Sequence, residues 1–219
     1  MINYIKKHLI KRPSIQDVLC FTLVPLMKNK SKLFSNILFY FKTKIYGITC
    51  NGKVTCYGMP HLVRAPYSKI IFGTNVSMVS NSYRSSAASI HAPVKIQTMS
   101  DTSFIEIGDD VGLNGTSIVS RSKKIIIGSG SIIAPNVIIM DSDFHALWPP
   151  ENRVTNPGLE NDKDVIIGKN VWIGTGSIIL KGTVIGDNSI VGAGSVVTGT
   201  VCANVVVAGN PAKIIKQLV

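Results

Sequence analysis

The sequence predicts an all-β protein that is built as a parallel β-solenoid. Three observations support this prediction: a six-residue repeat in the C-terminal part, a break in the repeat at a histidine, and a basic N-terminal quarter that lacks the repeat. The chain has 219 residues, of which 45% are hydrophobic and 16% charged. This composition is typical of a globular protein rather than of a disordered one.

The repeat is clearest from Ile167, where the chain reads IGKNVW, IGTGSI, ILKGTV, IGDNSI, VGAGSV and VTGTVC. Every hexad begins with Ile or Val, and its fifth residue is small or β-branched. An α-helix cannot use this pattern, because residues six apart fall ~120° out of line at 3.6 residues per turn. Short strands can use it if each hexad supplies one strand and one corner, with its aliphatic side chain inward and successive turns stacked ~4.8 Å apart.

The same spacing recurs upstream of Ile167. The aliphatic positions in phase are Ile127, Ile133 and Ile139, then Ile107, Leu113 and Val119, with weaker traces at Phe72, Met78, Ile90 and Ile96. We therefore expect three parts: a basic, helical segment over residues 1–54, a β-helix over 55–208, and a short C-terminal segment over 209–219. The spacing itself does not fix the handedness of the solenoid.

The repeat breaks within the segment MDSDFHALWPP, residues 140–150. Counting on from Ile139, the next inward position falls on His145, and an imidazole among aliphatic side chains would lack hydrogen-bond partners. The segment that follows carries three prolines and no hexad until Ile167. The coil is therefore expected to end at His145, and residues 146–164 are expected to form a loop that leaves the solenoid.

Positive charge is concentrated at the N-terminus. Residues 1–50 hold nine Lys or Arg and one acid, Asp17, which accounts for +8 of the net charge of +11. Such a segment fits either a solvated helical face or a contact with anionic lipid or another acidic surface. Its apolar stretches, residues 18–27 and 33–41, are about half the ~20 residues that span a bilayer. We expect a cytoplasmic protein, with peripheral membrane contact left open.

The cysteines, at positions 20, 50, 56 and 202, lack the spacing of a zinc site or a disulfide framework. We expect reduced packing residues and no bound metal. No nucleic-acid motif is present, so any binding to nucleic acid would be nonspecific and sensitive to salt.

The hexads, with NVWIG (170–174), IGDNSIVGAGSVVT (185–198) and VVVAGNPAKII (205–215), closely resemble the hexapeptide-repeat acyltransferases. The resemblance is to the branch of galactoside, xenobiotic and surface-polysaccharide O-acetyltransferases. It implies a left-handed parallel β-helix with three hexads per coil, a homotrimer, and acetyl-coenzyme A bound between subunits as the acyl donor.

His145 resembles the catalytic histidine that members of this family carry at the root of such a loop. Transfer of an acetyl group from a thioester to a sugar hydroxyl requires a base near neutral pH, and a neutral imidazole suits that task. A carboxylate or carbonyl on the other ring nitrogen would fix the tautomer, with Asp141 and Asp143 as candidates. Alternation along an extended chain favours Asp143. Both aspartates could equally serve only to turn the chain.

The resemblance also assigns binding positions. Asn114 matches a polar position that contacts the acceptor, although Asn-Gly is also an ordinary corner. The positions that match the donor groove are Gly174, Thr175, Ala193, Gly194, Thr198, Gly199, Lys213 and Lys216. Gly199 departs from the Lys that many relatives carry there, and Lys181 is a candidate to replace that phosphate contact. Packing of the hexads would demand the small residues with or without a ligand.

The sequence therefore predicts an acetyl-coenzyme A-dependent O-acetyltransferase that acts on a sugar of a surface polysaccharide or its precursor. One alternative keeps the fold and acetylates an amino sugar or an antibiotic on nitrogen. Another is a non-catalytic β-helix scaffold. A hexapeptide carbonic anhydrase would need a cluster of metal-binding histidines that the sequence does not supply.

Overall fold

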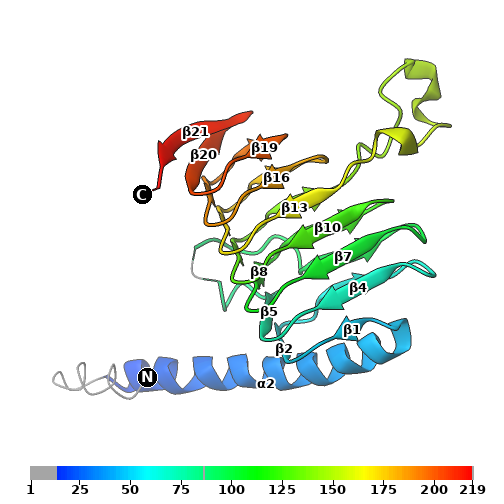
Figure 1. The fold of residues 1–219 in the computed structure, drawn as a ribbon. Coiled ribbons are helices and arrows are strands. Elements are labelled where there is room, and N and C mark those ends of the chain that lie inside the picture. Colours follow the sequence, from blue (N-terminus) through cyan, green and yellow to red (C-terminus); the bar gives the residue numbers. More distant parts are fainter. Residues whose placement is uncertain (1–13, 86, 219) are drawn as a thin grey trace.

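The computed structural model describes residues 14–85 and 87–218, and the part of the basic segment before residue 14 lies outside this description. A long helix, α2 (Ile15–Tyr46), lies across one end of a parallel β-helix (Figure 1). The strands form three sheets, which we name A, B and C in the order in which each coil visits them. The described architecture is the predicted one: a β-helix with a helical cap, a protruding loop after His145 and a short C-terminal hairpin (Figure 1).

The three sheets contain all the described strands. Sheet A consists of β1 (Thr49–Cys50), β4 (Lys69–Phe72), β7 (Phe104–Ile107), β10 (Lys124–Ile127), β13 (Val165–Ile167), β16 (Val184–Ile185) and β19 (Thr200–Val201). Sheet B consists of β2 (Val54–Tyr57), β5 (Val76–Val79), β8 (Gly112–Asn114), β11 (Ile132–Ile133), β14 (Trp172–Ile173), β17 (Ile190–Val191), β20 (Val205–Gly209) and the antiparallel β21 (Ala212–Gln217). Sheet C consists of β3 (His61–Val63), β6 (Lys95–Thr98), β9 (Ser117–Ser120), β12 (Ile138–Met140), β15 (Ile178–Ile179) and β18 (Val196–Val197).

The hexads place their first residues in the core as predicted. The Ile and Val residues at 167, 173, 179, 185, 191 and 197 are each at most 1% exposed. They stack in register from coil to coil: Ile139, Ile179 and Val197, for example, are successive partners in sheet C. Burial of this aliphatic column, at ~25 cal/mol per Å² of apolar surface, is the main source of stability that the repeat provides.

Small polar residues at the fifth hexad position are buried without being left unpaired. The hydroxyl of Thr183 donates to the carbonyl of Val197 at 3.1 Å, and that of Ser189 donates to the carbonyl of Cys202 at 2.8 Å. A buried hydroxyl needs such a partner. The repeat therefore uses Ser and Thr where a corner brings carbonyls of the next coil within reach.

Asparagines form the corner between sheets A and B. Asn170, Asn188 and Asn204 have φ of 54°, 59° and 58°, a region that Asn tolerates better than most residues. Their side chains form a ladder, since Asn170 donates to Asn188 at 3.2 Å and Asn188 donates to Asn204 at 3.0 Å. The ladder aligns successive coils.

The upstream phase differs from the prediction at two positions. Ile118, rather than Val119, is the buried aliphatic residue of β9, because the corner after Leu113 is one residue shorter than the corner after Ile133. Ile90 lies in a loop between β5 and β6 and is not a core residue, whereas Ile96 is fully buried. Irregular corners of this kind leave no trace in a six-residue count.

Helix α2 covers the open end of the first coil. Phe39 is fully buried and packs edge-on against Phe72, with ring centroids 5.8 Å apart. The side chain of Asn36 accepts from the N–H of Cys56 at 3.0 Å and donates to its carbonyl at 3.1 Å. The helix thus satisfies the free edge of β2, which would otherwise offer unpaired backbone groups.

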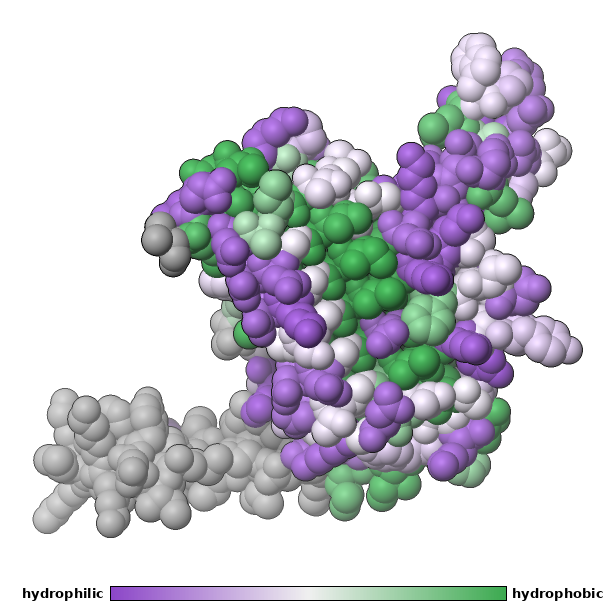
Figure 2. Space-filling model, viewed as in Figure 1, coloured by the Kyte–Doolittle hydropathy of each residue, from purple (hydrophilic) through white to green (hydrophobic). Residues whose placement is uncertain are grey.

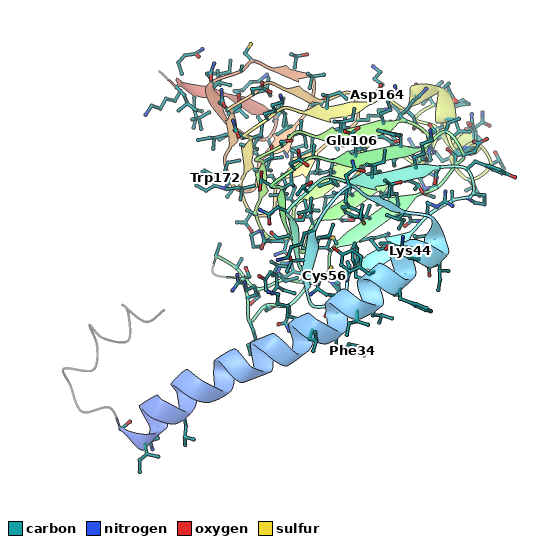
Figure 3. The ribbon with its side chains drawn as sticks, turned by 60° about the horizontal axis from the view of Figure 1, so that its bottom comes forward. Phe34, Lys44, Cys56, Glu106, Asp164 and Trp172 are labelled. Atoms are coloured by element: carbon teal, nitrogen blue, oxygen red, sulfur yellow. The ribbon has the colours of Figure 1, made fainter. Side chains whose placement is uncertain are left out.

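Burial also makes Cys56 unreactive. The side chain lies between α2 and the sheets (Figure 3), and burial raises its thiol pKa to about 12, with the neighbouring Cys50 as a smaller cause. Cys50, Cys56 and Cys202 are free thiols. Within the described part of the chain, no helix has the length and apolar character needed to cross a membrane.

Candidate active site

The residues that the sequence singled out fall at two corners of the β-helix. Asn114 ends strand β8 of sheet B, and Gly174, Thr175, Ala193 and Gly194 follow later strands of that sheet. These residues lie at the corner between sheets B and C. Asp143, His145, Thr198 and Gly199 follow strands of sheet C and lie on the side of the corner between sheets C and A. Lys213 and Lys216 are exposed on β21. Within one chain, sheet C separates Asn114 from His145.

The chain leaves the β-helix directly after β12, and Asp141 anchors the point of departure. Asp141 is fully buried, and its carboxylate accepts from the backbone N–H groups of Arg121 at 2.7 Å and Lys123 at 2.8 Å. Its own carbonyl accepts from the N–H of Lys163 at 3.0 Å, so the outgoing and returning legs of the loop meet there. The carboxylate of Asp141 is therefore hydrogen-bonded to the backbone of residues 121–123, and it forms no hydrogen bond with His145.

His145 lies outside the aliphatic core, on the exposed surface at the root of the loop. Its Nδ1 is 2.7 Å from the carbonyl oxygen of Arg153, on the short 3₁₀ helix Pro150–Arg153. A carbonyl can only accept a hydrogen bond, so Nδ1 carries the proton in this arrangement. The neutral imidazole therefore keeps its lone pair on Nε2, which is the state that a general base requires.

Asp143 faces a different partner from the one expected. Its carboxylate forms an ion pair with the ammonium of Lys181. The expectation assumed an extended chain, but Phe144 has a φ of 65°, and this left-handed residue breaks the alternation between 143 and 145. Asp143 and Lys181 are therefore paired with each other, and the group that contacts Nδ1 of His145 is a backbone carbonyl.

A buried arginine, which the sequence did not single out, holds the loop. Arg121 donates from Nε and Nη2 to the carboxylate of Asp162 at 2.9 and 2.5 Å, and from Nη2 to the carbonyl of Gly158 at 2.9 Å. A further hydrogen bond goes from Nη1 to the carbonyl of Pro157. The guanidinium also lies 5.8 Å from the centre of the Phe144 ring, next to His145. Arg121 therefore links the outgoing leg of the loop to the returning leg.

The electrostatics of Asp162 agree with this pairing. Burial raises the pKa of its carboxyl group, but hydrogen bonds from Arg121, Ser122 and Ser142 and the charge of Arg121 lower it further than burial raises it. The net effect is a lowered pKa, so the carboxylate stays ionised beside the guanidinium. A buried ion pair needs this degree of hydrogen bonding to offset its loss of hydration.

The glycines assigned to the donor groove differ in their surroundings. A Cβ on Gly174 would lie 2.5 Å from the backbone nitrogen of Ala193, so stacking of the coils alone requires glycine there. Gly194 and Gly199 have φ of 68° and 73°, and a Cβ on either would meet nothing within 4 Å. Their backbone is therefore bare and open to a ligand. The hydroxyl of Thr175 instead donates to the carbonyl of Pro135 at 2.7 Å.

In the described residues, no three His, Cys, Asp or Glu side chains are grouped so that they could hold a metal ion. The arrangement offers an imidazole held through Nδ1 on a clamped loop, two open glycine corners and two exposed ammonium groups on the C-terminal strand. The imidazole can take up and release a proton, and the glycine corners and ammonium groups can bind a ligand.

Known proteins resemble this chain in sequence over about half of its length. Residues 164–199 match the family described as bacterial transferase hexapeptide (six repeats). The chain is 44% identical to a putative acetyltransferase of Dictyostelium discoideum, over 52% of this chain and 58% of that protein. It is 35% identical to the galactoside O-acetyltransferase of Escherichia coli, over 53% of this chain and 55% of the relative. The matches thus span less than two thirds of the relatives' own length.

Solved structures resemble most of the fold. An N-acyltransferase from Bacillus cereus, AntD, crystallised with dTDP and 3-hydroxybutyryl-CoA, aligns over 82% of this chain and 88% of its own with a TM-score of 0.60 and 20% identity. At that identity the likeness concerns the fold, and it agrees with the predicted left-handed parallel β-helix. The sequence matches confirm the resemblance on which that prediction was based. Over about half of its length, the chain is similar to acetyltransferases, and its residues 164–199 match the hexapeptide-repeat transferase family.

Proposed function

We propose that this protein is an acyltransferase that moves an acetyl group from acetyl-coenzyme A to a sugar hydroxyl of a surface polysaccharide or its precursor. The observation that carries the proposal is the hydrogen bond from Nδ1 of His145 to the Arg153 carbonyl, which leaves Nε2 as a base. Relatives named for lipopolysaccharide biosynthesis and polysialic acid O-acetylation, both from Escherichia coli, support a sugar acceptor.

In this mechanism, Nε2 of His145 takes the proton of the acceptor hydroxyl as its oxygen attacks the thioester carbon. The C–S bond then breaks, and the imidazolium returns the proton to the leaving thiolate, so the products are an ester and a free thiol. The Arg153 carbonyl accepts a stronger hydrogen bond from the imidazolium than from the neutral ring, and it thereby stabilises the charged state. No acyl-enzyme is required.

The separation of Asn114 from His145 supports a site that is completed by a second copy. Ile132 and Trp172 are partners in register on sheet B and are both exposed, at 56% and 53%. Figure 3 shows Trp172 projecting from the β-helix. Figure 2 shows a further hydrophobic strip over the sheet A strands that face the viewer. We propose a homotrimer in which the His145 corner of one subunit faces the Asn114 corner of the next.

The proposal is tested by the release of free thiol from acetyl-coenzyme A in the presence of nucleotide sugars, polysaccharides and amino sugars. We expect release that depends on an acceptor hydroxyl and a product that mild alkali hydrolyses. A product that resists alkali would identify an amide and an N-acetyltransferase. No release with any acceptor, together with no coenzyme A binding, would leave the scaffold alternative.

Replacing Asp143 with asparagine tests which group orients His145. Because the Nδ1 partner is the Arg153 carbonyl, we expect kcat/KM to fall less than ~10-fold, well short of the loss on removal of a general base. The pair with Lys181 is partly exposed, so we expect the free energy of unfolding to change by only ~0–1 kcal/mol. A loss of activity as large as that of His145→Ala would instead assign the orienting role to Asp143.

Replacing Lys213 and Lys216 together with glutamine tests the proposed phosphate contacts. Exposed charge contacts contribute ~0.5–1 kcal/mol each, so we expect the KM for acetyl-coenzyme A to rise about 5–30-fold at constant kcat. The matched control is Lys53→Gln with Lys169→Gln, which removes the same charge at the corner between sheets A and B. Equal effects in both variants would show that net charge, rather than these two positions, attracts the donor.

A further inference from the structure

One face of α2 carries a row of apolar side chains that the described residues leave mostly exposed. Its members, which we name the apolar stripe, are Leu33, Phe34, Ile37, Phe41 and Ile45, each between 61% and 69% exposed. At ~100° per residue, all five lie within ~60° of the direction opposite the buried Phe39. The stripe therefore faces directly away from the β-helix, and Figure 3 shows Phe34 on that side of the helix.

The stripe is continuous rather than scattered. It extends over 13 residues, which corresponds to ~18 Å of helix at 1.5 Å per residue. Soluble proteins expose isolated apolar side chains as a matter of course, but a row of this length with two phenylalanines marks a contact surface. The buried face of the same helix is already used by the first coil of the β-helix.

The charge around the stripe identifies what covers it. On the helical wheel, Lys44 lies within the arc of the stripe and Lys42 lies about 60° beyond its edge. No Asp or Glu occurs between Lys32 and Tyr46. Over residues 1–50 the net charge is +8. Contact between two copies of α2 would bring like charges together, whereas anionic head groups would neutralise them.

We propose that α2 docks on the surface of an anionic phospholipid bilayer. The apolar stripe enters the boundary between head groups and acyl chains, and the long side chains of Lys42 and Lys44 extend to the phosphates, as in other interfacial amphipathic helices. The helix lies in the plane of the interface and does not cross it, in keeping with the absence of a spanning helix from the described residues.

The position of α2 makes this docking compatible with an open site. The helix lies across one end of the β-helix, and the loop that bears His145 projects toward the opposite end (Figure 1). A bilayer against the stripe would therefore leave the loop exposed to solvent. The proposal does not depend on acyl transfer, since vesicle binding is measured without any substrate.

The test is co-sedimentation of the full chain with vesicles of phosphatidylcholine alone and of phosphatidylcholine mixed equally with phosphatidylglycerol. We expect binding to the anionic vesicles that weakens between ~50 mM and ~500 mM salt. Replacing Phe34 and Phe41 with serine should lower the partition coefficient by about 100-fold, because two large side chains no longer leave water. The control is Tyr67→Ser with Tyr83→Ser, which removes two exposed aromatic rings that do not belong to α2 and should leave binding unchanged.

Molecular mass and thermal unfolding of each variant complete the experiment. Unchanged mass and unfolding temperature in Phe34→Ser/Phe41→Ser, with loss of vesicle binding, would support the proposal. It would be overturned by no binding to anionic vesicles, by equal binding to neutral ones, or by undiminished binding of the variant. A lower mass in the variant would also overturn it, because the stripe would then be an interface between copies.

Discussion

Replacement of His145 with alanine is expected to lower the kcat of acetyl transfer by ~10²–10⁴, the range that a positioned general base contributes. The KM values should change little, because the imidazole acts on the proton that moves in the transition state rather than on bound substrate. His145 is exposed and has a single described hydrogen bond, to Arg153, so the fold should not depend on it. The measurement is thiol release at saturating acetyl-coenzyme A and acceptor.

His91→Ala is the matched control for this experiment. It removes an exposed imidazole from the loop between β5 and β6, and we expect wild-type kinetics. Added imidazole should restore part of the activity of His145→Ala if the missing group is a base. Transfer at the wild-type rate in His145→Ala would remove this residue from the mechanism.

The sequence predicted the fold because the repeat reports directly on the core. Buried aliphatic residues such as Ile179 occur at a fixed spacing, because every coil must place an aliphatic side chain inward at the same point. The prediction was wrong at Val119, where a shortened corner shifts the phase by one residue. A period can be read from a sequence, but the number of residues in one corner cannot.

The site was only partly accessible to the same reasoning. His145 stood out because it interrupts a pattern. Its Nδ1 partner is the backbone carbonyl of Arg153, and a carbonyl has no sequence signature. The pairing of Arg121 with Asp162 joins residues 41 apart across an irregular loop, so no local motif announces it. The prediction that Asp143 and His145 project in the same direction holds only for an extended chain, and the left-handed conformation of Phe144 between them removes that condition.

Replacement of Arg121 with alanine should have the largest effect on structure. It would leave the carboxylate of Asp162, which is 4% exposed, buried without its cation, and such a loss costs ~3–5 kcal/mol. It would also remove the donors to Pro157 and Gly158 and the contact with Phe144. We expect this cost to appear as opening of the loop, since the aliphatic core of the coils does not include Arg121.

Hydrogen exchange of the Ala146 amide, which donates to the Asn156 carbonyl at 3.0 Å, measures that opening. Exchange should accelerate by about 10²–10³ or more in Arg121→Ala, and kcat should fall because His145 loses its fixed position. Arg84→Ala is the control: this exposed arginine lies over the Tyr57 ring, a contact that contributes only ~0.5–1 kcal/mol. Unchanged exchange in Arg121→Ala would show that other contacts hold the loop.

The same pair predicts how loop closure depends on pH. The pKa of Asp162 is lowered from its ordinary value of 3.8 in the folded protein, so ionisation favours the closed loop. This contribution is fully present above pH 3.8 and is lost as the pH falls through the lower, folded-state pKa. Asp162→Asn should therefore open the loop at neutral pH and flatten its acid dependence. A variant that keeps the wild-type acid dependence would assign it to another carboxylate, because Asp162 would then contribute nothing to the proton uptake that accompanies opening.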